Sequence, residues 1–455
     1  MIRRNKYTVS AGYALLLFLC VVTFFSCSKK ENPPVAGDDS AQAGCVSCHT
    51  NYEKLKQIAA PDTSTGGGGC GGDAPHIETY DRVYLGGDGY TAFQSTAHGK
   101  MECVTCHGGD VTASEKTMAH GSTFINHPSL QASSICGPCH SSETTHAANS
   151  IHAQGWGQKS MVTLRYGATS FDALPATLKS GYDVNCGKCH GTCGDCHVNR
   201  PKAGGGGLLK GHLFFRTPDM RQNCTACHTS RGGHAYFGVA PGSQPDIHLS
   251  KLPNGGHCLG CHSGTELHGD GQVYDQRYKV PALPKCETCH ANLASKNAYH
   301  SMHLTTFNCQ TCHSQDYNNC GSCHIGGEGA RIPSYQGFKI GMNPISPTRT
   351  YKYATLRRSL MAPDSWKEYG VPQLANFDVR PTYKYATPHN IQRWTKRTQV
   401  DSGKSCSNNC HVIQEGSTFR NKELYLFNSD LQSWEVNADQ GIVVDGKLPS
   451  VWGVQ

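Results

Sequence analysis

The sequence predicts a mostly irregular and α-helical fold with few β-strands. Glycine accounts for 51 of the 455 residues and hydrophobic residues for only 37%. Long stretches with apolar residues at helical spacing are scarce, so few extended amphipathic helices are expected. A short cysteine-rich motif recurs eleven times. It leaves about 40 residues per copy, which is too little for each copy to have a hydrophobic core of its own.

Ten of the motifs read Cys-x-x-Cys-His, and the eleventh has three residues between its cysteines. Their residues are Cys45, Cys48 and His49; Cys103, Cys106 and His107; Cys136, Cys139 and His140; Cys186, Cys189 and His190; Cys193, Cys196 and His197; Cys224, Cys227 and His228; Cys258, Cys261 and His262; Cys286, Cys289 and His290; Cys309, Cys312 and His313; Cys320, Cys323 and His324; and Cys406, Cys410 and His411. Zinc ribbons and disulfides do not require a histidine after every second cysteine. Attachment of c-type haem does, because two thioethers hold the porphyrin and the histidine binds the iron. The motifs therefore predict eleven molecules of haem c.

Two of these motifs stand almost end to end. Only Gly191 and Thr192 separate His190 from Cys193. The backbone between the two motif histidines spans at most roughly 25 Å when extended. Two macrocycles fixed this close together are expected to touch.

Through motif and spacing, residues 45–411 resemble the multihaem c-type cytochromes, here an eleven-haem member of the outer-membrane lipoprotein type. The resemblance implies that covalently bound haems form the core, with loops and short helices carrying their ligands. It also implies electron transport in anaerobic respiration. On this basis we expect a ten-haem body over residues 45–324, a haem-free segment over 325–405, and the eleventh site with a C-terminal cap over 406–455.

The N-terminus has the layout of a secretory signal. Basic residues at Arg3, Arg4 and Lys6 precede an apolar run of about 15 residues, which is shorter than the roughly 20 needed to span a bilayer. Ser26-Cys27 then resembles the cleavage site of a bacterial lipoprotein signal, with residues 1–26 removed and Cys27 lipidated. An ordinary cleaved signal and an uncleaved anchor remain alternatives. Residues 27–44 are polar and predict a flexible tether, so the protein is expected to be exported and held at the outer membrane.

The number of histidines outside the motifs indicates how many irons could have a second histidine ligand. Of 25 histidines, eleven belong to the motifs and fourteen remain. The residues predicted as distal ligands are His76, His98, His120, His127, His146, His152, His212, His234, His248, His268, His300, His303 and His389. His257 abuts its own motif and is the poorest candidate. His300 and His303 share a helix face if helical and are expected to serve two neighbouring haems.

Cys70 is left over once the signal, lipid and haem cysteines are assigned. It lies in a glycine-rich segment, residues 66–72. A free loop cysteine, an axial thiolate and a substrate-reactive thiol all remain open.

The segment 325–405 contains the short repeat Thr-Tyr-Lys-Tyr-Ala-Thr at residues 350–355 and 382–387. Alternating tyrosines predict paired strands or loops that lie on a haem edge. The segment is interpreted either as an aromatic surface for a partner or as packing over the last haems. In the tail, residues 423–435 predict an amphipathic helix and residues 441–447 a hairpin.

The formal charge of +7 does not indicate nucleic-acid binding, because each haem brings two acidic propionates. Six-coordinate bis-histidine haems transfer electrons without binding substrate, so the first functional hypothesis is electron transfer to redox proteins or extracellular acceptors. The alternative is a reductase of small nitrogen or sulfur oxyanions with one open or unusual haem. The sequence places that haem at His49 near Cys70, or at the stretched His411 motif. A polymerising filament subunit is a third, less natural, hypothesis.

Overall fold

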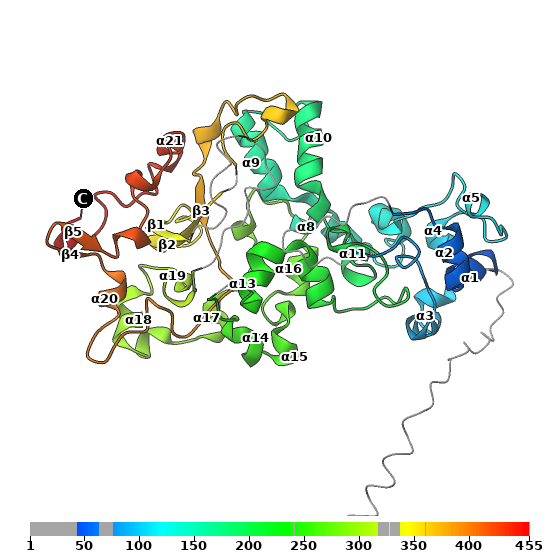
Figure 1. The fold of residues 1–455 in the computed structure, drawn as a ribbon, viewed down its shortest axis with the longest axis horizontal. Helices are drawn as coiled ribbons and strands as arrows, with labels where there is room; N and C mark the ends of the chain where they lie inside the picture. Colours follow the sequence, from blue (N-terminus) through cyan, green and yellow to red (C-terminus); the bar gives the residue numbers. More distant parts are fainter. Residues whose placement is uncertain are drawn as a thin grey trace, which may run out of the picture. The chain divides into compact units, whose positions relative to one another are not determined.

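The computed structural model describes residues 43–62, 76–239, 242–316, 327, 337–359 and 361–454. All of them belong to one compact unit, Gln42–Gln455. Helical residues make up 43% and strand residues 7%, which confirms the predicted class of a helical and irregular chain with few strands. Figure 1 shows the succession of short elements along the chain.

The helices are mostly one or two turns long. In the first part of the unit they are α1 (Ala43–His49), α2 (Tyr52–Ile58), α3 (Asp88–Gln94), α4 (Cys103–His107), α5 (Lys116–Ala119), α6 (Ala132–Ile135), α7 (Ser141–Ala148), α8 (Ile151–Gln154), α9 (Trp156–Tyr166), α10 (Ala176–Asn185) and α11 (Cys193–His197). The later ones are α12 (Thr225–Cys227), α13 (His234–Phe237), α14 (Ile247–Lys251), α15 (Pro253–Gly256), α16 (Gly264–His268), α17 (Cys286–Cys289), α18 (Ala298–His303), α19 (Cys309–His313), α20 (Ser407–Cys410) and α21 (Val436–Asp439). Short 3₁₀ or π turns lie between them.

The strands form two small antiparallel sheets. In the first, β2 (Tyr353–Arg358) pairs on one side with β1 (Lys339–Met342) and on the other with β3 (Tyr383–Tyr385). The second is a hairpin of β4 (Ile413–Glu415) and β5 (Thr418–Arg420). The two copies of the tyrosine repeat overlap β2 and β3, which confirms the prediction of paired strands. Tyr353 and Tyr383 are almost fully buried, so these tyrosines pack inside the protein and do not form an exposed aromatic surface.

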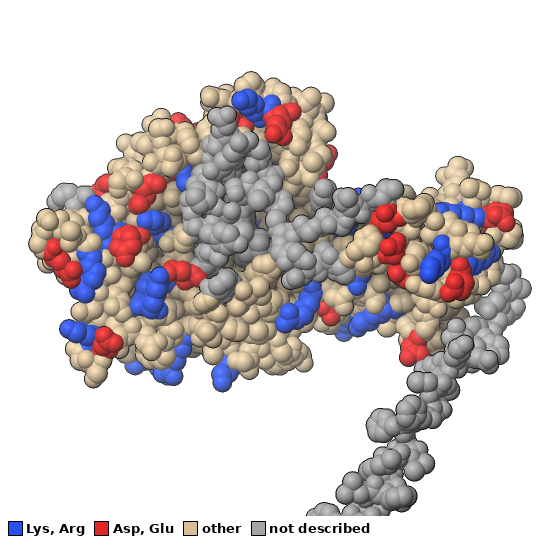
Figure 2. All heavy atoms as spheres, viewed as in Figure 1, with Lys and Arg blue, Asp and Glu red and all other residues tan. Residues whose placement is uncertain are grey.

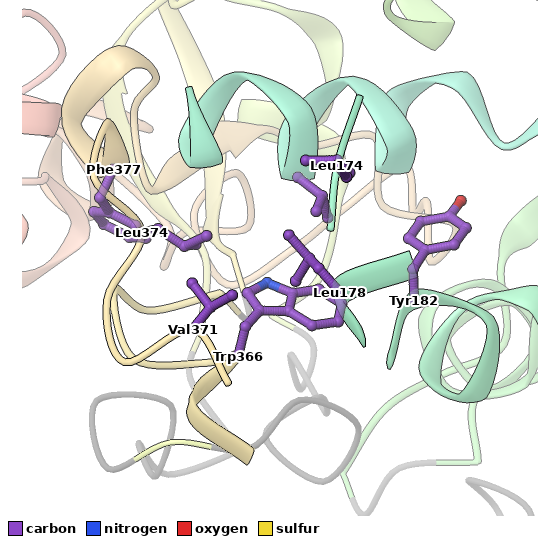
Figure 3. Packing of buried hydrophobic residues seen from close by; sticks show 8 residues of the cluster. Leu174, Leu178, Tyr182, Trp366, Val371, Leu374 and Phe377 are labelled. Atoms are coloured by element: carbon purple, nitrogen blue, oxygen red, sulfur yellow. The ribbon is translucent and has the colours of Figure 1, made fainter. Parts of the chain in front are cut away.

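The two longest helices, α9 and α10, enclose an apolar cluster with the segment that follows β2. Its buried residues are Val162, Leu174, Leu178, Tyr182, Trp366, Val371, Leu374 and Phe377. Figure 3 shows Trp366 in the middle of this cluster and Tyr182 at its end, with the Tyr182 hydroxyl pointing away from the other labelled side chains. The cluster holds α10, and with it Tyr182, in a fixed position.

Two further apolar clusters join the first sheet to the C-terminal tail. Ile340 and Tyr353 pack with Val444 in one, and Leu356 packs with Leu426 in the other. The tail differs from the sequence prediction. Residues 423–435 contain the short turns η13 (Lys422–Leu424) and η14 (Asn428–Asp430) and no amphipathic helix, and residues 441–447 form turns without paired strands.

A buried polar network also fixes the tail to the sheet. The guanidinium of Arg358 on β2 donates hydrogen bonds to both carboxylate oxygens of Glu435, one of them from Nε at 2.7 Å. The Thr382 hydroxyl donates to Glu435 at 2.8 Å, and Asp439 accepts from the backbone N–H of Thr382 and Tyr383. Burial raises the pKa of Asp439 to about 6. Arg358 and Glu435 thus satisfy one another, and Asp439 is satisfied by hydrogen bonds from Thr382 and Tyr383, as buried charges require.

Within the part of the chain described, no helix combines the length and the apolar character needed to cross a membrane.

Candidate haem-binding sites

Most of the motifs adopt a helical turn. The turns α1, α4, α11 and α19 each run through both cysteines to the histidine, and α17 and α20 end at the second cysteine. In a helix, residues three and four positions apart lie on one face. A Cys-x-x-Cys-His sequence in this conformation therefore presents two thiols and one imidazole on the same side, as haem attachment requires.

The decisive geometric observation is that nine motif histidines each face a second histidine. The ring-centroid distances are His49–His120 6.0 Å, His140–His98 6.0 Å, His107–His212 6.0 Å, His228–His152 6.2 Å, His197–His268 6.0 Å, His290–His248 6.1 Å, His262–His389 6.2 Å, His313–His300 6.1 Å and His411–His303 6.3 Å. The interplanar angles range from 10° for His98–His140 to 83° for His152–His228. The distance is thus constant while the ring orientation is not.

This constant distance fits one metal ion between each pair of rings. An imidazole nitrogen binds a metal at roughly 2 Å and lies about 1 Å from its ring centre, so rings on opposite sides of one ion have centroids about 6 Å apart. Stacking between the rings themselves would not hold one distance across such different angles. The residues therefore fit bis-histidine haem iron at nine sites.

Hydrogen bonds orient several of these rings by the Nδ1 nitrogen. Nδ1 of His107 lies 2.9 Å from the Ile125 carbonyl oxygen, and Nδ1 of His197 lies 2.8 Å from that of Phe215. Nδ1 of His262 is 2.9 Å from Glu266 Oε1. A histidine that donates from Nδ1 keeps Nε2 unprotonated and available to a metal.

Burial affects the protonation state of the most enclosed rings. Desolvation lowers the pKa of both His212 and His228 to about 4. Both imidazoles are therefore neutral at pH 7 and carry a nitrogen lone pair.

The attachment cysteines of different motifs adjoin one another in a continuous series. Some neighbouring thiols share a hydrogen bond. Others are close enough for the charge of one thiolate to change the pKa of the next. The pKa of Cys136, for example, is raised by burial and then by the charge of Cys193. The adjoining pairs are Cys45–Cys103, Cys106–Cys136, Cys136–Cys193, Cys196–Cys224, Cys224–Cys258, Cys261–Cys289, Cys286–Cys309 and Cys312–Cys410. We call this the attachment series; by motif histidine it runs 49, 107, 140, 197, 228, 262, 290, 313, 411.

The motif ending at His190 joins this series from the side. Its Cys189 thiol hydrogen-bonds to Cys227 of the His228 motif, and that motif also adjoins Cys196 of the His197 motif. Among the described residues no histidine faces His190. Its Nε2 is instead 3.2 Å from the Tyr182 hydroxyl oxygen.

The remaining predicted ligands have different surroundings. His76, His127 and His146 are exposed and do not face a motif histidine in the part of the chain described. His234 is on α13, and its Nε2 is buried without a hydrogen-bond partner among the described residues. His257, the poorest candidate, has Nε2 2.9 Å from the Pro218 carbonyl oxygen and accepts from the Leu259 N–H at Nδ1.

Several predicted features lie outside the described residues. These are the lipidation site Cys27, the extra cysteine Cys70, and the motif Cys320, Cys323 and His324. The two locations that the sequence favoured for an unusual haem differ from the structure, because His49 faces His120 and His411 faces His303. Unusual neighbours in sequence drew attention to those motifs, whereas His190 has no such local signal.

Comparison with family models, curated proteins and solved structures found no match to this chain. The described residues also contain no group of three or more His, Cys, Asp or Glu side chains placed to hold a bare metal ion.

Proposed function

We propose that this chain is a multihaem c-type cytochrome that transfers electrons along a series of closely spaced haems. The observation that carries the proposal is the set of nine histidine pairs at 6.0–6.3 Å, each including a motif histidine. The cysteines of each motif would form the thioethers and the paired histidines would bind the iron from both sides. Haem held in this way supplies reversible one-electron chemistry.

The chain's own residues account for two requirements of this function. The facing histidines would hold the iron from both sides at nine sites and would leave no position there for a substrate. The attachment series brings successive motifs against one another, so each motif in the part of the chain described has a close neighbour. The sequence further suggests a lipid anchor at Cys27, a location at the outer membrane, and redox proteins or extracellular acceptors as partners.

The charged side chains of one face of the protein are of mixed sign. Figure 2 shows Lys and Arg interspersed with Asp and Glu over the described residues of this face. Nucleic-acid binding typically uses a continuous basic stripe or patch.

Intact-mass analysis of protein made in a host that attaches c-type haem tests the proposal. We expect the mass of eleven haems on the wild-type chain. The double variant Cys406→Ala, Cys410→Ala should carry one haem fewer, which would show that the stretched motif is used. The variant Cys70→Ser should carry the same number of haems as the wild type. A wild-type mass without haem would contradict the proposal.

One observation favours the alternative function as well, a reductase of small oxyanions with one unusual haem. His190 lies opposite a tyrosine and not a histidine.

A further inference from the structure

Two of the histidines that face a partner ring are hydrogen-bonded to a buried carboxylate. Nδ1 of His262 lies 2.9 Å and 3.0 Å from the two carboxylate oxygens of Glu266, and Nδ1 of His248 lies 2.8 Å from Asp246 Oδ1. The side chains of Glu266 and Asp246 are only 11% and 4% exposed. Each carboxylate is therefore held away from water against a ring that we propose as an iron ligand.

The other facing histidines have uncharged partners at this nitrogen. Nδ1 lies close to a backbone carbonyl oxygen in five contacts, which are His49–Val83 at 3.1 Å, His107–Ile125 at 2.9 Å, His197–Phe215 at 2.8 Å, His303–Tyr299 at 2.9 Å and His313–Gln392 at 3.2 Å. Among the facing histidines of the described residues, contact with a carboxylate is confined to His248 and His262.

Glu266 is placed by the helix that follows its own motif. Ser263 caps the N-terminus of α16, and its hydroxyl accepts from the Glu266 N–H at 3.1 Å. The first turn of α16 thereby directs Glu266 back to His262, four residues earlier in the chain.

Asp246 joins two segments that carry proposed ligands. It caps α14, where its Oδ1 accepts from the backbone N–H of His248 at 2.9 Å. Its Oδ2 accepts from the backbone N–H of Ile391 at 2.7 Å. Ile391 follows His389 by two residues, and His389 is the ring that faces His262. The same carboxylate therefore fixes one ligand ring and the backbone beside a ligand of the adjoining site.

The two sites with a carboxylate are neighbours in the attachment series. His248 faces His290, and Cys289 of that motif adjoins Cys261 of the His262 motif. The His262 and His290 motifs are sixth and seventh in the series. Five motifs thus lie on one side of the two sites and two motifs on the other.

A carboxylate at Nδ1 favours the ferric state of a haem. By accepting the hydrogen bond it makes the imidazole a stronger donor to the metal. It also places a negative charge near the iron, where the exclusion of water strengthens the interaction. Both effects stabilise ferric iron more than ferrous iron, because the ferric ion carries the larger positive charge. The reduction potential of such a haem is therefore lowered.

We propose that Glu266 and Asp246 are positioning residues that give the haems of the His262 and His290 motifs the lowest reduction potentials among the nine facing-histidine sites, and so divide the series into two electron pools. This inference rests on the electron-transfer function proposed above. Electrons from a redox partner reduce the outer haems first. An electron that crosses between the pools oxidises the iron at His228, reduces the iron at His262 and moves on through the next site, so the two inner haems stay mostly ferric.

A redox titration of the haem-loaded wild-type chain, followed by electron paramagnetic resonance, tests the order of potentials. Low-spin ferric haems with nearly parallel axial rings give signals distinct from those with nearly perpendicular rings. The interplanar angle is 21° for His262–His389 and 71° for His248–His290. As dithionite is added, we expect the last two ferric signals to disappear to be one of each kind. Two last signals of the same kind would overturn the inference.

Two isosteric variants test the carboxylates themselves. Glu266→Gln should shift only the near-parallel signal to higher potential, and Asp246→Asn only the near-perpendicular one. At a fixed potential the ratio of reduced to oxidised haem at that site should rise by about 10-fold or more, which is about 59 mV for one electron. Glu287→Gln is the matched control, because it removes a carboxylate within the His290 motif that is bonded to the Tyr351 hydroxyl at 3.0 Å and not to a histidine ring. It should leave both signals close to their wild-type potentials.

The outcomes separate this inference from the proposed function. Haem-loaded variants that titrate like the wild type would show that the carboxylates do not set these potentials, while the electron-transfer proposal would stand. An equal shift in Glu287→Gln would also contradict the inference, since any nearby charge would then suffice. If a variant fails to bind its haem, the order of disappearance in the wild type decides. Absence of haem from the wild-type protein would instead refute the proposed function.

Discussion

Replacing Cys258 and Cys261 with alanine will stop electrons that enter at the His49 site from reaching the His411 site. The His262 motif lies inside the attachment series, sixth of its nine motifs. It adjoins the His228 motif through Cys224 and the His290 motif through Cys289. Without its haem the two halves of the series are separated by a gap, and electron transfer rates fall steeply with distance.

The matched control is the double replacement of Cys186 and Cys189, which also removes one haem. The His190 motif joins the series from the side, and the contact between Cys196 and the His228 motif persists without it. Transfer from end to end should therefore stay close to the wild-type rate. Equal losses in the two variants would contradict the order of sites derived from the structure.

The measurement uses a photosensitiser and a spectroscopic reporter at opposite ends of the series. Lys56→Cys, exposed on α2, is labelled in a Cys70→Ser background to inject an electron near the His49 site. His303→Met gives the His411 haem a distinct histidine–methionine absorption. Transient absorption of this band then reports arrival of the electron in each variant.

Replacing His389, a proposed distal ligand, with methionine should raise the reduction potential of one haem by roughly 0.1–0.3 V, a fraction of the ~0.8 V over which axial ligands tune haem. His389 is buried and faces His262 at 6.2 Å with an interplanar angle of 21°. Thioether ligation stabilises ferrous haem relative to imidazole, so one component of a spectroelectrochemical titration should move to higher potential.

His257→Met is the matched control for this substitution. Both ring nitrogens of His257 are engaged by protein hydrogen bonds, so its replacement should leave all potentials nearly unchanged. Identical titrations for the two variants would show that His389 is not an iron ligand.

The sequence predicted which residues group locally better than how the groups are arranged. Every motif is visible locally, because its two cysteines and its histidine are neighbours in the sequence. The surplus of histidines likewise predicted a second histidine near most motifs, and nine of the described motif histidines do face one. The pairing itself depends on tertiary structure: His98 precedes its partner His140, whereas His389 lies in the segment 325–405, which has no motif, and reaches back to His262.

Dependence on tertiary structure also explains which features the sequence did not predict. Residues 423–435 have an apolar pattern that suits a helix, but Leu426 and Phe427 are instead used to cover the sheet from an irregular segment. The His190 site gave no local signal, since its motif is regular and its exceptional feature is the tyrosine brought over it by α10. Glycine-rich composition obscured the three apolar clusters, which draw residues from distant parts of the chain.

The central claim, that iron lies between facing histidines, is tested most directly by crystallography of the haem-loaded protein at the iron absorption edge. We predict an anomalous peak midway between the rings of each of the nine histidine pairs. Peaks displaced from these midpoints, or histidine pairs without iron, would contradict the account.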